Sequence, residues 1–216
     1  MIEIIEPVRS GKPVEITEPV LLLVEGDDEK EFFGALLREM KMTGIQVQDF
    51  RGKNNLSNFL ETLRDQHGFA QRVVSLGIVR DADDSPEGAF QSVGTALRNN
   101  KFPQPSKPET PEGNNPRVAV LILPDAETSG MLETICLRSV ADDPVMQCIG
   151  EYFNCIRKVS QLPGNMDKAM VQAFLASRPE SVPHLGIAAQ KDYWQWNNQA
   201  FDHVKGFLRV LQTDVQ

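Results

Sequence analysis

Acidic residues follow two short apolar runs, at points where the chain would leave a strand and enter a turn or helix. The first run ends in Glu25-Gly26-Asp27-Asp28-Glu29, and the second ends in Arg80-Asp81-Ala82-Asp83. The carboxyl ends of neighbouring parallel strands form the edge at which open α/β sheets bind their ligands. Carboxylates gathered there repel one another unless a cation lies between them. Oxygen donors of this kind suit Mg²⁺, with Mn²⁺ as a possible substitute, so the pattern predicts a divalent metal site.

The types of these residues suggest separate roles. Asp81 and Asp83 are spaced i and i+2, which in an extended segment directs both carboxylates to the same side, where they could share one ion. Glu25 has a longer reach and could complete the metal shell or act as a general acid or base on a phosphodiester. Lys53, in the polar loop 51–55, is a candidate phosphate contact, and Lys168 is a candidate for stabilising charge in the transition state.

Some of these residues also have a purely structural interpretation. Asp27 and Asp28 open a predicted helix, where carboxylates accept from free backbone N–H groups and complement the helix dipole. Glu29 lies in the same first turn, so dipole complementation competes with metal binding there. Glu133, inside a later predicted helix, and both lysines could simply be solvated surface residues.

The elements that would position these side chains alternate along the chain. Strands are predicted at 20–24, 45–50, 73–80 and 117–123. Helices are predicted at 27–41 and 56–67 and from 86 onward, and an exposed loop at 101–116. This order predicts an α/β fold of three layers, with a mostly parallel central sheet between helices. Residues 1–18 are expected to form an N-terminal arm or hairpin, and residues 126–216 a helical C-terminal part packed on the core.

Glu25-Gly26 after one strand and Asp81-Ala82-Asp83 after a later one resemble the Toprim family, over about residues 20–125. Topoisomerases, bacterial primases, recombination proteins and OLD-family nucleases share this catalytic domain. Glu29, one helical turn after Glu25, is similar to the Glu-x-x-x-Glu arrangement of OLD-type nucleases. Likeness to topoisomerases implies that Glu25 is a general acid or base. Likeness to the nucleases implies that Glu25, Glu29 and Glu133 help hold a second ion. The resemblance places a Toprim-like domain at 19–125.

Composition narrows the functional classes. The chain has 216 residues and a formal net charge of −8, which argues against a generally basic coat for nucleic acid. No apolar run is long enough to span a bilayer, and the N-terminus does not resemble a signal peptide. The three cysteines form no metal-binding pattern and are expected to be buried free thiols in a reducing cytoplasm.

These observations favour Mg²⁺-dependent phosphoryl transfer on nucleic acid, most simply by a Toprim/OLD-like nuclease acting on DNA or RNA. The alternative is a non-catalytic metal-binding module that recognises nucleic acid or a nucleotide for a partner protein such as an ATPase. A small phosphorylated metabolite is a third possible substrate. The aromatic segment 193–196 could stack on bases, or could pack a late helix onto the body.

Overall fold

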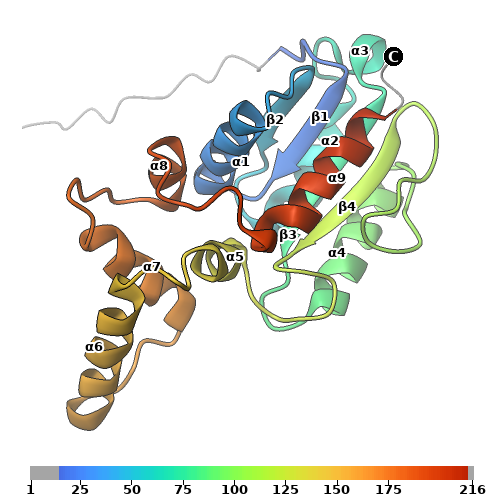
Figure 1. The fold of residues 1–216 in the computed structure, drawn as a ribbon. Helices are drawn as coiled ribbons and strands as arrows, with labels where there is room; N and C mark the ends of the chain where they lie inside the picture. Colours follow the sequence, from blue (N-terminus) through green and yellow to red (C-terminus); the bar gives the residue numbers. More distant parts are fainter. Residues whose placement is uncertain (1–14, 214–216) are drawn as a thin grey trace, which may run out of the picture.

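A computed structural model of the chain describes residues 15–213. Its centre is a parallel sheet of four strands (Figure 1). In spatial order these are β2 (Ile45–Asp49), β1 (Val20–Val24), β3 (Ser75–Asp81) and β4 (Arg117–Leu123). Every residue of β1 is buried, as expected for a continuous apolar run covered on both faces. The predicted α/β class and parallel sheet are confirmed.

Helices cover both faces of the sheet and complete three layers. On one face lie α1 (Asp27–Glu39) and α9 (Asp202–Gln212). On the other lie α2 (Leu56–Leu63), α3 (Phe69–Arg72) and α4 (Pro86–Asn99). The predicted α4 begins as its sequence indicates, because Ser85 accepts a hydrogen bond of 3.0 Å from the Gly88 N–H and Pro86 occupies the first turn.

The order of the strands creates a switch point between β1 and β3. The chain leaves β1, runs through α1 on one face and reaches β2 at the edge. It then crosses back through α2 on the opposite face to β3, on the other side of β1. The neighbouring ends of β1 and β3 therefore lead into helices on opposite faces of the sheet. A crevice opens between two such ends, and ligands bind there in folds of this type.

The remaining helices form the C-terminal part, which also extends beyond the sheet. They are α5 (Leu132–Ser139), α6 (Val145–Val159), α7 (Met166–Ala176) and α8 (Leu185–Gln190). Figure 1 shows α8 beside α1, whereas α6 and α7 form a hairpin that projects away from the sheet. A 3₁₀ turn at Gln199–Phe201 precedes the last helix, α9. Neither α8 nor α3 was predicted from the sequence.

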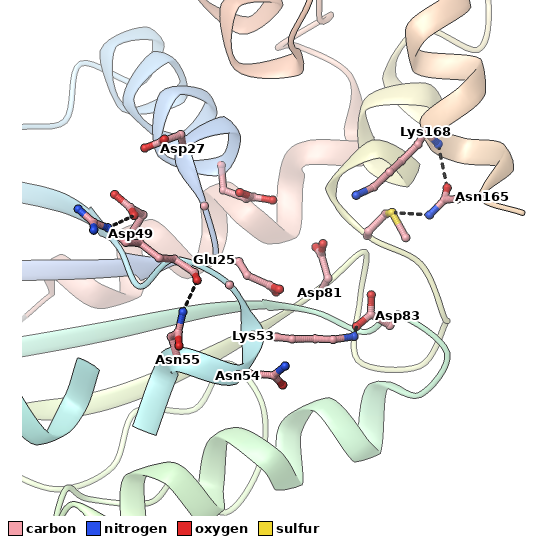
Figure 2. Close-up of a pocket in the computed structure, with 15 residues that line it drawn as sticks. Glu25, Asp27, Asp49, Lys53, Asn54, Asn55, Asp81, Asp83, Asn165 and Lys168 are labelled. Atoms are coloured by element: carbon pink, nitrogen blue, oxygen red, sulfur yellow. Dashed lines mark hydrogen bonds and ion pairs between the residues drawn. The ribbon is translucent and has the colours of Figure 1, made fainter. Parts of the chain in front are cut away.

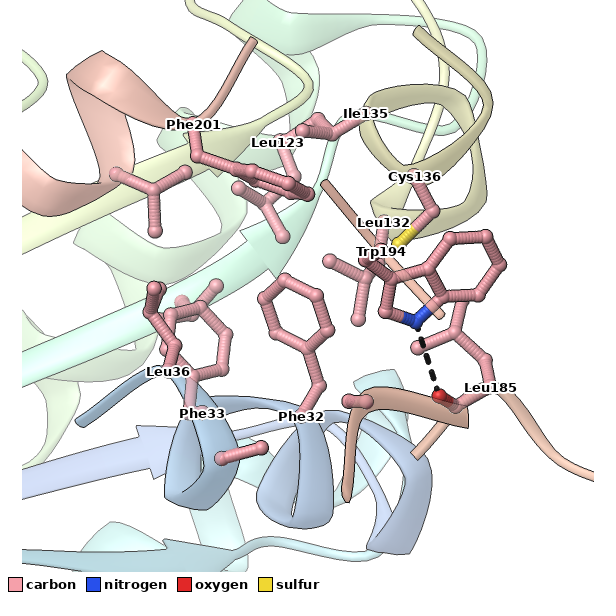
Figure 3. Close-up of a cluster of buried hydrophobic side chains, with 14 of the residues drawn as sticks. Phe32, Phe33, Leu36, Leu123, Leu132, Ile135, Cys136, Leu185, Trp194 and Phe201 are labelled. Atoms are coloured by element: carbon pink, nitrogen blue, oxygen red, sulfur yellow. Dashed lines mark hydrogen bonds between the residues drawn. The ribbon is translucent and has the colours of Figure 1, made fainter. Parts of the chain in front are cut away.

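Aromatic rings attach the C-terminal segment to the core (Figure 3). The ring of Trp194 stacks on Phe174 with centroids 5.5 Å apart, and its Nε1 donates to the Leu185 carbonyl over 3.2 Å. The Trp196 and Phe32 rings lie 5.3 Å apart. Trp194 and Trp196 are only 1% and 6% exposed. The base-stacking interpretation of these tryptophans is therefore wrong, and the alternative of packing is correct.

The cysteines differ from their prediction. All three are free, but only Cys136 is buried, whereas Cys148 and Cys155 are exposed on α6. Because α6 packs mainly on α7, much of its surface, including both of these cysteines, stays exposed. Within residues 15–213, the helices are all too short or too polar to cross a membrane.

Candidate functional site

A pocket of about 790 Å³ opens where β1, β2 and β3 end, at the switch point of the sheet (Figure 2). Its lining is largely charged or amide-bearing. The polar side chains that line it are Glu25, Asp27, Glu29, Asp49, Arg51, Lys53, Asn54, Asn55, Asp81, Asp83, Asn165 and Lys168. The strand ends and the N-terminus of α7 thus bring together residues far apart in the sequence. Of the predicted site residues, only Glu133 lies outside this lining.

Arg80, which the sequence analysis did not select, is the buried cation of the site. It is 8% exposed, and its Nη1 donates to Glu25 Oε2 over 2.7 Å. The same nitrogen donates to the Asp81 carbonyl over 2.8 Å, and Nη2 donates to Asp83 Oδ2 over 3.2 Å. A buried arginine needs such partners. The signal was present in the sequence, since an arginine within an apolar strand demands a nearby acid.

Asp81 has no hydrogen bond from a cationic side chain within residues 15–213. It ends β3, and its Oδ1 accepts a hydrogen bond of 3.1 Å from the Leu132 N–H at the start of α5. Burial raises its pKa well above the ordinary value, and the negative charges of Glu29, Glu133 and Glu25 raise it further. The hydrogen bond from Leu132 opposes this shift. A nearby positive charge would stabilise the ionised carboxylate and lower the pKa of Asp81 again.

Asp83 has different partners from Asp81. Its backbone is left-handed, with φ of 50°, and pairs with Gly130 through hydrogen bonds of 2.9 and 2.8 Å. Its carboxylate accepts from Lys53 Nζ over 3.0 Å as well as from Arg80. Burial raises its pKa, but the hydrogen bonds from Lys53 and Arg80 outweigh this effect and lower it. The expectation that Asp81 and Asp83 point to the same side assumed an extended segment. The left-handed backbone at Asp83 departs from that geometry.

Glu29 and Glu133 lie at the starts of α1 and α5. Desolvation by burial raises the pKa of each, and Glu133 adds to the shift of Glu29. An adjoining pocket of about 660 Å³ is lined by both residues and by Lys168 and His184. Lys168 Nζ lies 3.8 Å from Glu133 Oε1, which makes it a link between the two pockets. Neither Glu29 nor Glu133 is a simple solvated surface residue.

Two local contacts hold the rim in place. Gly52 has φ of 98°, and its N–H donates to the Glu25 carbonyl over 2.7 Å, which ties the loop after β2 to the end of β1. On the other side, the Thr134 hydroxyl donates to the Asp167 carboxylate and joins α5 to α7. These contacts position Lys53 and Lys168 on separate parts of the rim.

The carboxylates are gathered, but they do not form a finished coordination sphere. In residues 15–213, no three His, Cys, Asp or Glu side chains are arranged to hold a metal ion as they stand. The donor chemistry nevertheless fits a hard divalent cation, because the buried Asp81 has three neighbouring carboxylates and receives no side-chain hydrogen bond from a cation. The metal site predicted from the sequence stays a prediction.

Comparison with known proteins gives a family and a set of solved structures. No curated protein matches the chain. The C-terminal region of the OLD protein of Xanthomonas campestris pv. campestris is similar in structures phased with platinum, iodine and mercury. The platinum structure is 15% identical, covers 88% of this chain and 97% of the other, and has a TM-score of 0.42. The iodine structure is 14% identical, covers 89% and 95%, and has a TM-score of 0.45. Residues 19–213 match the family described as "Protein of unknown function (DUF3226)", and the chain therefore belongs to that family.

Proposed function

We propose that this protein is a Toprim-like, Mg²⁺-dependent phosphodiesterase that cleaves DNA or RNA. One observation carries the proposal. Asp81 is buried among other carboxylates that raise its pKa, at the base of an open pocket with lysines on its rim. Selection for stability does not explain this arrangement, because carboxylates held close together repel one another and lower the stability of the folded state. Strongly perturbed acids in a cleft are typical of functional sites.

The acids best placed to hold a divalent ion are Glu29 and Asp81, whose carboxylates receive no hydrogen bond from a cationic side chain in the described part of the chain. Glu25 would have to exchange its contact with Arg80 for the ion, and Asp83 its contacts with both Lys53 and Arg80. Glu133, on the far side of Glu29, is the added ligand for a second ion. Mn²⁺ has a similar preference for oxygen donors and is expected to substitute. When bound, the ion would polarise a phosphoryl oxygen and lower the pKa of a water molecule. Binding requires the carboxylates to turn inward, and the glutamates have the side-chain length to do so.

The basic residues of the rim would bind the phosphodiester. Lys53 is half-exposed, and its ammonium group lies between Asp83 and the open pocket. Lys168 enters from α7 on another part of the rim, so the two lysines could contact successive phosphates. Glu25 is partly exposed beside them and is the residue we assign to proton transfer. The net charge of −8 means that affinity for nucleic acid must come from this local set of cations.

Cleavage assays test the proposal directly. Single- and double-stranded DNA and RNA are incubated with the protein and Mg²⁺ or Mn²⁺, or with EDTA. We expect metal-dependent cleavage that falls by at least about a hundredfold in Asp81→Asn and Glu25→Gln. Asp142→Asn and Glu61→Gln remove a charge from exposed acids that do not line the pocket and should retain full activity.

The same variants separate the proposal from its alternatives. Equal cleavage by wild-type protein and Asp81→Asn would exclude the site. Metal binding that Asp81→Asn abolishes, without turnover of any nucleic acid, would indicate the non-catalytic module and a separate partner such as an ATPase. Turnover of phosphorylated small molecules, with nucleic acids left intact, would indicate the metabolite alternative.

A further inference from the structure

Helix α6 carries an exposed apolar stripe that borders the groove between α6 and α7. Cys148, Tyr152, Cys155 and Val159 are spaced by four, three and four residues, which is the spacing of a coiled-coil seam. Both cysteines are exposed, and Tyr152 and Val159 are 55% and 77% exposed. Only three large hydrophobic residues among residues 15–213 are classed as exposed, and two of them belong to this stripe.

A shallow apolar groove of about 780 Å³ continues the stripe toward α7. Its floor contains Ile149 and Phe153 of α6, and small residues of α7, Ala173 and Ala176, form its other wall. Small side chains on one wall allow another helix to approach closely. The hairpin of α6 and α7 projects from the body, so no other element of the described chain covers this surface in Figure 1.

Two charged residues beside the stripe indicate which kind of partner binds it. Glu151 and Lys158 are seven residues apart and therefore lie on the same flank of α6, next to the seam. Neither forms an ion pair within residues 15–213. When two copies of α6 pair in antiparallel orientation about a two-fold axis, Cys148 of one copy meets Val159 of the other, and Tyr152 meets Cys155. This register places Glu151 of each copy beside Lys158 of the other.

We propose that the exposed face of α6 binds a second copy of this chain, in an antiparallel two-fold pair held by the apolar seam and two Glu151–Lys158 ion pairs. Self-association explains why one flank carries both signs of charge, since an isologous contact must be self-complementary. A parallel pairing would bring neither charge against an opposite one. The proposal is independent of the nuclease assignment, because none of these residues lines the carboxylate pocket.

The size of the contact sets its strength. A single pair of helices of 15 residues forms a small interface, so we expect a dissociation constant on the order of 10 µM rather than an obligate dimer. The pairing would also fix α7, which packs on α6 and carries Lys168 to the pocket.

Analytical ultracentrifugation of the full chain, in the presence of a reducing agent, tests the pairing from about 1 to 300 µM. We expect a reversible monomer–dimer equilibrium. Lys158→Glu should raise the dimer dissociation constant at least about tenfold, because it sets acid against acid in both ion pairs. Arg157→Glu makes the same charge change in the same last turn of α6 but on the opposite side of the helix, and should leave the constant unchanged.

Charge exchange provides the decisive control. Glu151→Lys alone should weaken the dimer, and the double variant Glu151→Lys/Lys158→Glu should restore it to within about threefold of the wild-type constant. Tyr152→Glu should abolish it, with circular dichroism confirming that the exposed substitution leaves the fold intact. A monomer at every concentration overturns the proposal. So does a dimer whose constant is the same in Lys158→Glu and Tyr152→Glu as in the wild type.

Discussion

The Arg80 guanidinium joins the ends of two neighbouring strands, with its Nη1 2.7 Å from Glu25 Oε2. Arg80 belongs to β3 and Glu25 follows β1, so the ion pair spans the switch point of the sheet. The arginine compensates Glu25 and Asp83 but makes no side-chain contact with the Asp81 carboxylate. One cation therefore compensates two of the three strand-end acids, and the third, Asp81, accepts its hydrogen bond from the Leu132 N–H instead.

Arg80→Met should lower the free energy of unfolding by about 2–4 kcal/mol at pH 7, because it leaves partly buried carboxylates without their partner. Chemical denaturation with EDTA present measures the loss. Arg138→Met is the matched control, since Arg138 forms a 3.2 Å pair with Asp125 whose side chains are 46% and 34% exposed, against 9% for Arg80. That change should cost less than about 1 kcal/mol. Equal losses in the two variants would argue against a special role for Arg80.

Asp81→Asn should stabilise the metal-free protein, by about 1 kcal/mol at pH 7. Burial and neighbouring acids raise the pKa of Asp81 above the ordinary value of 3.8, so its ionised form is disfavoured in the folded state. That cost is absent below pH 3.8 and is complete once the pH exceeds the raised pKa. The gain should therefore shrink as the pH falls toward 3.8, while Oδ1 of Asn can still accept from Leu132.

Added Mg²⁺ should make the wild type more stable than Asp81→Asn, which reverses their order of stability in the metal-free state. A ligand that binds only the folded state raises its stability, so Mg²⁺ is expected to raise the melting temperature of the wild type and to leave Asp81→Asn unchanged. Thermal unfolding with and without Mg²⁺ gives the comparison. A wild-type protein less stable than Asp81→Asn under all metal concentrations would argue against an ion at this position.

Sequence reasoning located most of the sheet but not all of the site. The strands at 20–24 and 117–123 match β1 and β4, because continuous apolar runs permit few other interpretations. It missed Arg80, because the pairing of an arginine with Glu25 depends on the spatial order of the strands. It also missed the left-handed Asp83, because its bridge to Gly130 is a contact between segments distant in the sequence.

The rim lysines should set the salt dependence of nucleic-acid binding. Lys53→Ala and Lys168→Ala should each reduce the slope of log K against log salt by about one, as expected when one phosphate contact is lost. Lys41→Ala, exposed beyond the end of α1 at the opposite edge of the sheet, should leave the slope unchanged. Fluorescence anisotropy with a labelled oligonucleotide and Ca²⁺ in place of Mg²⁺ measures it. Identical slopes for the three variants would show that Lys53 and Lys168 do not contact the nucleic acid.

Helix α8 lies so close to α1 at Gly186 that a larger side chain should not fit there. A Cβ on Gly186 would lie 2.6 Å from the Glu31 Cβ and 2.9 Å from the Asp28 carbonyl oxygen. Gly186→Ala should therefore lower the free energy of unfolding by about 1–3 kcal/mol. Gly206→Ala, in α9 with open space around its Cβ, should instead add about 0.5–1 kcal/mol through helix propensity. Urea denaturation distinguishes these opposite signs.

Anomalous diffraction from a crystal soaked in Mn²⁺ tests the metal site most directly, because it gives both the number of ions and their ligands. We predict a peak inside the pocket within coordination distance of the Asp81 carboxylate and of Glu25 or Glu29. A crystal saturated with Mn²⁺ that shows no peak there, with Arg80 still bound to Glu25 and Asp83, would contradict the central claim.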